Sequence, residues 1–239
     1  MTSFARSIAA ERPEEIALRD PRQALTWLDV DNVLNRAANA IRLADTGPDL
    51  RIAVFAENGV ETALANLGGL IGGASVVPIN FHLTAEEVAY ILSDSGARMV
   101  FLGPETAERG LEAAALAGID QVIGWRCEIP GLKSWSEWLA ASSPEEPDTS
   151  IPPRPNLLYT SGTTGRPKGT HLPPTMFAGG DTVEAHLQNL KLNPLAALGP
   201  HLVVGPMYHT GPLSGARLLA AGAPSVILTK FDPENTLKT

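Results

Sequence analysis

Short apolar runs alternate along this chain with longer segments in which apolar residues recur every three or four positions. The short runs are typical of buried strands, and the longer segments are typical of helices with one apolar face. One such helical face, between residues 28 and 41, consists of Val30, Val33, Leu34, Ala37 and Ile41. The order strand, helix, strand over residues 52–79 predicts a βαβ unit with a right-handed crossover. The pattern therefore predicts an α/β fold, in which layers of parallel sheet carry helices on both faces.

The predicted elements follow one another to the end of the chain. Strands are expected at residues 16–18, 24–27, 52–56, 74–79, 98–102, 121–123, 157–159, 201–204 and 225–228. Helices are expected at residues 28–41, 60–71, 84–93, 105–117, 134–139, 182–190 and 213–221, with a further helix beginning at Asp232. Thr84 with Glu87, and Ser134 with Glu137, have the spacing of a capping box, so each pair marks a helix start.

A proline-rich segment divides this pattern. Residues 142–155 contain five prolines and three acidic residues, which is typical of a linker or a surface excursion. Residues 1–141 are therefore expected to form a first α/β region and residues 156–239 a second one.

One segment joins a strand to a loop rich in hydroxyl groups. Residues 156–169 read NLLYTSGTTGRPKG, and their hydroxyl residues after the strand are Thr160, Ser161, Thr163 and Thr164. The glycines at positions 162, 165 and 169 allow positive φ and a close approach of the backbone to a ligand. Hydroxyl and backbone N–H groups can cradle an anion, and Lys168 adds a charge suited to phosphate oxygens. We therefore expect this loop to bind the phosphates of a nucleotide.

Two other interpretations of the loop are weaker. Glycine, serine, threonine and proline are common in solvated surface turns, but a turn requires neither this density of hydroxyls nor a terminal lysine. The P-loop motif G-x-x-x-x-G-K-[ST] needs glycine directly before lysine, whereas Pro167 precedes Lys168 here. The residues therefore disfavour a P-loop NTPase.

A second candidate cluster lies at residues 205–211, GPMYHTG, directly after an apolar strand. Ligands of open α/β sheets bind beyond the carboxyl ends of the strands. A histidine beside an aromatic residue and glycines can line a pocket, although the residues alone slightly favour a packed or solvent-facing loop histidine.

Two other kinds of site are not supported. His82 and Glu86 lack a third metal ligand, so a metal site is not expected there. The sequence contains no G-x-S-x-G motif, so nothing supports a serine hydrolase.

Composition narrows the class of protein. Of the 239 residues, 44% are hydrophobic and 18% are charged, with a formal net charge of −8. Such an acidic chain without a basic stripe is not expected to bind nucleic acid or an anionic membrane surface. Cys127 is the only cysteine, so no internal disulfide can form, which fits a reducing compartment. The chain shows neither a signal peptide nor an apolar run of the ~18 residues that span a membrane, so we expect a cytoplasmic protein.

The eleven residues YTSGTTGRPKG, 159–169, resemble the signature loop of the adenylate-forming superfamily: acyl-CoA synthetases, luciferases and the adenylation domains of peptide synthetases. Residues 73–80, 83–84 and 90–97 are also similar to the early sheet of acyl-CoA synthetases. The resemblance implies an incomplete N-terminal AMP-binding domain of the acyl-CoA synthetase/luciferase-like fold over residues 1–239. It further implies that the loop embraces the β- and γ-phosphates of ATP. The implied nucleotide-binding residues are Thr160, Ser161, Gly162, Thr163, Thr164, Gly165 and Lys168, with Lys168 also assigned the catalytic role.

The same resemblance changes the interpretation of the second cluster. Acyl-CoA synthetases carry a similar Pro-x-aromatic-His motif at the acyl and nucleotide pocket, so Tyr208, His209 and Gly211 are expected to bind the acid. Pro173 and Pro174 follow His171 where the family usually begins a helix, so this helix start and any role of His171 depart from the family pattern.

The implied reaction is the ATP-dependent activation of a carboxylic acid, expected to be a fatty acid, to an acyl-adenylate, followed by thioester formation with CoA. Its cofactors would be ATP, Mg²⁺ and CoA. The helix expected from Asp232 has only six residues after Pro233 and no stop signal. The family's magnesium ligand, ribose-binding aspartate and C-terminal lysine are expected beyond residue 239, so we expect a piece of a longer chain. The alternatives are an amino-acid or acyl-carrier-protein-linked adenylation domain and a non-catalytic nucleotide-binding module. The sequence predicts neither the acid, nor the thiol acceptor, nor the oligomeric state.

Overall fold

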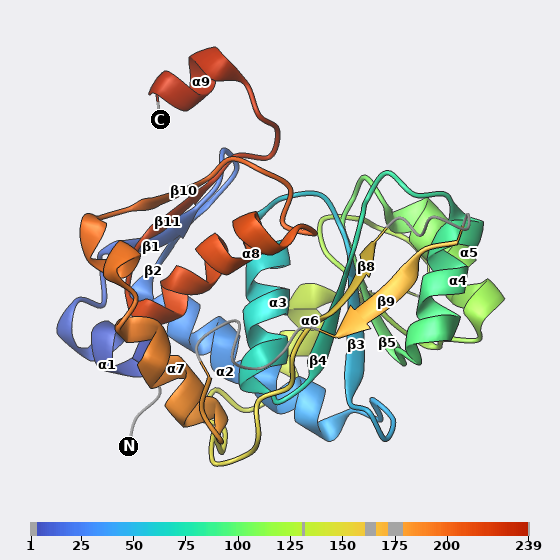
Figure 1. The fold of residues 1–239 in the computed structure, drawn as a ribbon, viewed down its shortest axis with the longest axis horizontal. Helices are drawn as coiled ribbons and strands as arrows, with labels where there is room; N and C mark the ends of the chain where they lie inside the picture. The colour runs from blue at the N-terminus through green and yellow to red at the C-terminus, as the bar shows by residue number, and fades with distance from the viewer. Residues whose placement is uncertain (1–3, 131, 161–165, 172–178, 239) are drawn as a thin grey trace.

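The structure, a computed structural model, describes residues 4–130, 132–160, 166–171 and 179–238 (Figure 1). A five-stranded parallel sheet has the order β4-β3-β5-β6-β7, with β3 (Arg51–Phe55), β4 (Ser75–Ile79), β5 (Met99–Leu102), β6 (Gln121–Gly124) and β7 (Lys133–Ser134). A four-stranded sheet has the order β10-β11-β1-β2, with β1 (Ile16–Arg19), β2 (Ala24–Thr26), β10 (His201–Val203) and β11 (Ser225–Ile227). Only β1 and β2 pair antiparallel in that sheet.

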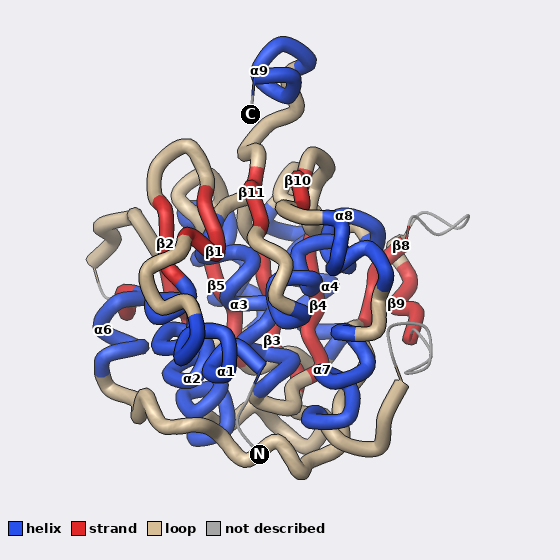
Figure 2. Tube along the Cα trace, turned by 90° about the vertical axis from the view of Figure 1, so that its left-hand side faces the viewer, coloured by secondary structure: helices blue, strands red, loops and turns tan. Residues whose placement is uncertain are grey.

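Helices separate and cover these sheets. The helices of the first region are α1 (Phe4–Glu11), α2 (Trp27–Leu43), α3 (Val60–Ile71), α4 (Ala85–Ser95), α5 (Ala107–Ala117) and α6 (Trp135–Ala140). Those of the second are α7 (Val183–Lys191), α8 (Thr210–Ala216) and α9 (Pro233–Lys238), with 3₁₀ helices at Pro194–Leu198 and Arg217–Ala221. Figures 1 and 2 show α9 projecting from the body of the chain beyond the ends of β10 and β11.

The alternation of side chains along β3 explains the layers. Ile52 and Val54 face one hydrophobic core with α2 and α3, whereas Ala53 and Phe55 face a second core with α4 and α5. The first core also receives residues of β1, β10 and β11, so α2 and α3 lie between the two sheets. This arrangement confirms the predicted α/β fold, with parallel sheet and helices on both faces.

Helix α3 is buried on every side, as a helix between two sheets must be. Its glycines permit close packing: a Cβ on Gly68 would lie 2.7 Å from the Cβ of Ala37, and one on Gly69 would lie 2.6 Å from Cγ2 of Val76. Glycine within a helix costs about 1 kcal/mol relative to alanine. Here that cost is offset by the close packing of α3 against α2 and against the sheet, which a larger residue would prevent.

Several local predictions are confirmed and others are wrong. Both predicted capping boxes are present, at the starts of α4 and α6. Trp27, expected in a strand, instead begins α2, because Thr26 and Asp29 form a third capping box. The helix expected at 213–221 is divided into α8 and a 3₁₀ helix. Helix α1 and strands β7 and β9 were not predicted.

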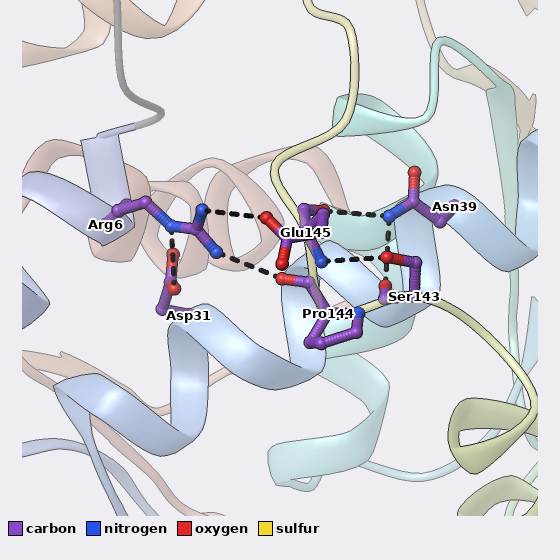
Figure 3. Close-up of polar contacts among 6 residues, drawn as sticks. All are labelled: Arg6, Asp31, Asn39, Ser143, Pro144 and Glu145. Atoms are coloured by element: carbon purple, nitrogen blue, oxygen red, sulfur yellow. Dashed lines mark hydrogen bonds and ion pairs between the residues drawn. The ribbon is translucent and has the colours of Figure 1, made fainter.

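Residues 142–155 contain no helix or strand, and they run along α2. Figure 3 shows how side chains of the first region reach their backbone. Nδ2 of Asn39 donates to the carbonyl oxygens of Ser143 (3.0 Å) and Glu145 (2.9 Å), and Nη2 of Arg6 donates to that of Pro144 (3.0 Å). Arg6 also pairs with Asp31 at 3.3 Å. The proline-rich segment is therefore fixed to α1 and α2 just before the chain enters β8 (Leu157–Thr160).

Candidate functional site

The predicted phosphate loop joins two strands of an antiparallel hairpin. Strands β8 (Leu157–Thr160) and β9 (Lys168–His171) pair with each other, and we call residues 157–171 the signature hairpin. Thr160 lies opposite Lys168 in the register, and both residues are exposed. Lys168, expected within the loop, thus belongs to a strand, where backbone pairing fixes its position. The predicted residues Ser161, Gly162, Thr163, Thr164 and Gly165 lie outside the described residues.

Gly169 has a steric role in this hairpin. It lies opposite Tyr159, and a Cβ at this position would come within 3.2 Å of the ring carbon Cζ of Tyr159 and 3.2 Å of Cδ1 of Leu157. The glycine therefore leaves room for the tyrosine ring to lie across β9. Gly169 is not among the glycines with positive φ, so the structure explains this glycine by side-chain packing and not by the positive φ predicted for it.

A buried polar pair fixes the base of the hairpin. Nη2 of Arg217 donates to Oδ1 of Asn156 at 2.8 Å, and both residues are at most 5% exposed. Burial lowers the pKa of Arg217 to about 10, so its guanidinium remains protonated at neutral pH. Because Asn156 directly precedes β8 and Arg217 directly follows α8, this bond links the start of the signature hairpin to the end of α8, whose first turn contains Thr210 and Gly211 of the second predicted cluster.

Asn58, in the turn after β3, holds that second cluster in place. The side chain is 4% exposed, and its Nδ2 donates to the carbonyl oxygens of Gly205 (2.8 Å) and Leu228 (3.2 Å). Its Oδ1 accepts the N–H of Met207 at 2.8 Å. One buried amide thus connects the carboxyl ends of β3, β10 and β11. It also fixes the backbone immediately before Tyr208 and His209.

The two predicted clusters meet at one cavity of about 370 Å³. Its lining residues are Pro78, Ile79, Asn80, Leu83, Ile91, Tyr159, Thr160, Pro167, Tyr208 and His209. Tyr208 packs edge-on against Phe81 with ring centres 5.7 Å apart, and His209 is the N-cap residue of α8. Gly211 is not among the lining residues and lies in the first turn of α8. The structure therefore brings together Thr160, Tyr208 and His209, and leaves Gly211 beside them.

The lining of this cavity is chemically mixed. Pro78, Ile79, Leu83 and Ile91 are apolar, whereas Asn80, Thr160 and His209 supply polar groups. Binding sites for small molecules commonly combine apolar walls with a few polar groups that fix orientation. Such a cavity suits a ligand with an apolar body and a polar group.

The described residues contain no group of three or more His, Cys, Asp or Glu side chains that could hold a metal ion. Mg²⁺ at nucleotide sites is commonly held by only one or two carboxylates together with substrate phosphates, and we derive no step through it. In the same part of the chain, no helix has the length and apolarity required to cross a membrane.

Comparison with known proteins places this chain in a family. Residues 5–239 match the family model described as AMP-binding enzyme, and the chain belongs to that family. Feruloyl-CoA synthase from Amycolatopsis sp is 32% identical over 228 residues, which are 92% of this chain and 42% of that protein. Tyrocidine synthase 3 from Brevibacillus parabrevis is 29% identical over 161 residues, which are 67% of this chain and 2% of that protein. The chain thus spans less than half the length of these relatives.

The fold is also similar to that of solved structures in the acyl-CoA synthetase group. The inhibitor-bound N-terminal domain of FACL13 from Mycobacterium tuberculosis superposes with a TM-score of 0.75, covering 100% of this chain and 60% of that one at 24% identity. This likeness confirms the predicted fold, the N-terminal domain of the acyl-CoA synthetase fold.

Three residues that position the site were not predicted from the sequence: Asn58, Arg217 and Asn156. One feature of the sequence could have indicated Asn58: it follows the carboxyl end of a predicted strand, where ligand sites of α/β sheets lie. No feature of the sequence indicates the bond between Arg217 and Asn156, since it joins positions 61 residues apart.

Proposed function

We propose that this chain forms the nucleotide- and acid-binding part of an ATP-dependent acid–CoA ligase. The observation that supports it best is the shared cavity, which is lined by Thr160 of the signature hairpin, by Tyr208 and His209, and by several apolar residues. ATP would place its β- and γ-phosphates at the hairpin, and an acid with an apolar body would occupy the cavity. A fatty acid or an aromatic acid meets that requirement.

The proposed reaction has two steps. An oxygen of the carboxylate attacks the α-phosphorus of ATP, the bond from that phosphorus to the bridging oxygen breaks, and pyrophosphate leaves. The sulfur of CoA then attacks the acyl carbon, its proton is released, and AMP departs with the electron pair of the broken C–O bond. Lys168 would contribute by orienting and stabilising the leaving phosphates, which is a positioning and electrostatic role. Mg²⁺, when bound, would neutralise charge on the same phosphates.

The cytoplasm is the proposed compartment, supported by the free thiol of Cys127 and the absence of any second cysteine for a disulfide.

Amino-acid adenylation is the alternative, and the similarity to tyrocidine synthase 3 supports it. An amino-acid substrate carries an ammonium group, which when buried needs a carboxylate or several acceptors nearby. No Asp or Glu occurs among the cavity-lining residues that the structure describes. The cavity therefore favours an acid without an α-amino group.

Stable mimics of the adenylate intermediate test this proposal. Adenosine 5′-sulfamates carrying benzoyl, feruloyl, dodecanoyl or phenylalanyl groups are titrated against the purified chain and compared with AMP. At least one of the first three mimics should bind more than about tenfold tighter than AMP, because it engages both halves of the site. The phenylalanyl mimic should gain less. Equal affinity of every mimic and AMP would contradict an acid pocket, and preference for the phenylalanyl mimic would establish the alternative.

A further inference from the structure

The signature hairpin rests against one side of α4 through two side chains. The hydroxyl of Tyr159 donates a hydrogen bond of 2.6 Å to Oδ2 of Asp94. The guanidinium carbon of Arg166 lies 5.3 Å from the ring centre of Tyr90. Tyr90 and Asp94 are four residues apart, so they lie on the same side of the helix.

These two contacts lie on either side of the phosphate loop. Tyr159 is in β8 before the loop, and Arg166 is in the segment that leads into β9. The connection between the contacts includes Thr160, and Lys168 follows Arg166 by two positions. A cation over an aromatic face and a hydrogen bond to a carboxylate are both directional attractions. Together they restrict where the ends of the loop can lie.

Helix α4 is a firm support for these contacts. A capping box of Thr84 and Glu87 fixes its start, and Gly96 in the left-handed conformation ends it. Its opposite side is buried through Val88, Ile91 and Leu92 in the second core. The turn before the helix is held by Arg109, whose guanidinium donates to the carbonyl oxygens of Leu83 (2.6 Å) and Phe81 (2.9 Å).

The donor at Tyr159 is available at neutral pH. Burial, followed by the hydrogen bond to Asp94 and the charge of that carboxylate, raises the pKa of the Tyr159 phenol above its ordinary value of 10.0. The phenol therefore keeps its proton and the carboxylate of Asp94 remains its acceptor.

We propose that Tyr90 and Asp94 are positioning residues for phosphate binding: α4 fixes both ends of the loop, and thereby presents Lys168 to the phosphates of ATP. This inference rests on the proposed function. It adds to that function two residues outside both predicted clusters, which act through Arg166 and Tyr159.

The test compares Tyr90→Leu and Asp94→Ala with three reference variants. Tyr90→Phe retains an aromatic ring for Arg166, Tyr159→Phe removes the donor opposite Asp94, and Ser93→Ala is an exposed change on the same helix. Affinities for ATP and AMP are measured by titration, global stability by urea unfolding, and hydrogen exchange at the amides of β8 and β9 by mass spectrometry. AMP is the internal control, because it lacks the two phosphates that the hairpin would hold.

Tyr90→Leu and Asp94→Ala should each weaken ATP binding by about three- to tenfold and accelerate exchange in the hairpin, at unchanged urea midpoint. AMP binding should change by less than about twofold, and Tyr90→Phe and Ser93→Ala should match the wild type. Adding Asp94→Ala to Tyr159→Phe should cause no further loss of ATP affinity, because both substitutions remove the same hydrogen bond. Equal weakening of ATP and AMP, or unchanged exchange in the hairpin, would overturn the proposal. If the wild type binds no ATP, the proposed function fails, and hairpin exchange alone then decides the positioning role.

Discussion

Replacing Asn58 should show how strongly one buried amide holds the site together. The Asn58→Ala substitution removes three hydrogen bonds, to Gly205, Met207 and Leu228, from a side chain that is 4% exposed. A typical hydrogen bond contributes about 0.5–1.5 kcal/mol, and a buried group left without a partner costs about 1–3 kcal/mol. With partial relaxation and entry of water, the free energy of unfolding should fall by about 2–4 kcal/mol.

Asn39→Ala is the matched control for this experiment. Its Nδ2 also donates to two carbonyl oxygens, those of Ser143 and Glu145, but from a partly exposed position on α2. Water can replace those bonds, so the loss should stay below about 1 kcal/mol. Asn58→Asp keeps the acceptor for Met207 while directing an ionised carboxylate at two carbonyl oxygens, and should be at least as damaging as Asn58→Ala.

Urea unfolding followed by tryptophan fluorescence measures these differences. The midpoint of Asn58→Ala should fall while its m-value stays at the wild-type value, as expected when only stability changes. Hydrogen exchange at the Met207 amide should accelerate more than exchange in β3. A loss below about 0.5 kcal/mol, or one no larger than that of Asn39→Ala, would refute the claim that Asn58 fixes the backbone before Tyr208.

Three further changes test other parts of the structure. His209→Ala should alter the ranking of acyl-adenylate mimics in the titration, while ATP affinity changes by less than about twofold. The reason is that His209 lines the cavity but does not belong to the signature hairpin. An equal loss of affinity for every ligand would instead place His209 at the phosphates. Gly69→Ala should destabilise the chain by about 1–3 kcal/mol in urea, since the new Cβ would lie within 2.7 Å of side-chain carbons of Val76 and Ile52, and a neutral result would contradict this packing. Glu57→Gln tests the pH dependence of stability. Burial raises the pKa of Glu57 above 4.5, so above pH 4.5 the folded chain retains a proton that the unfolded chain has lost, and the wild type loses stability as pH rises through the raised pKa. The stability of Glu57→Gln relative to wild type should therefore increase from about pH 4 to about pH 7, and a constant or opposite difference in urea midpoints would contradict the sign.

The parts of the fold that were predicted correctly depend on local pattern. The three-to-four spacing of apolar residues identified α2, and the capping boxes at Thr84 and Ser134 identified the starts of α4 and α6. Strand β9 escaped prediction because its sequence, KGTH, has no apolar run. It forms a strand because its backbone pairs with β8. Such pairing depends on the neighbouring strand and is not indicated by these four residues alone.

The candidate site divides in the same way. The motif at residues 159–169 and the cluster at 205–211 were visible in the sequence, and the structure brings Thr160, Tyr208 and His209 to one cavity. The residues that fix these two segments in position could not be predicted from the sequence. Asn58 contacts Met207 across 149 positions, and Tyr159 contacts Asp94 across 65. Such pairs depend on how the layers pack, and a single sequence does not specify them.

Titration of the purified chain with ATP tests the central claim most directly, with Lys168→Ala compared against Lys133→Ala. Both lysines are exposed and lie in strands, but only Lys168 belongs to the signature hairpin. The wild type and Lys133→Ala should bind ATP equally at a single site. Lys168→Ala should bind about tenfold more weakly, with an unchanged urea midpoint, because it loses one charge-assisted contact to phosphate. Absence of ATP binding by the wild type, or equal affinity of Lys168→Ala and Lys133→Ala, would contradict the assignment of this hairpin as the phosphate site.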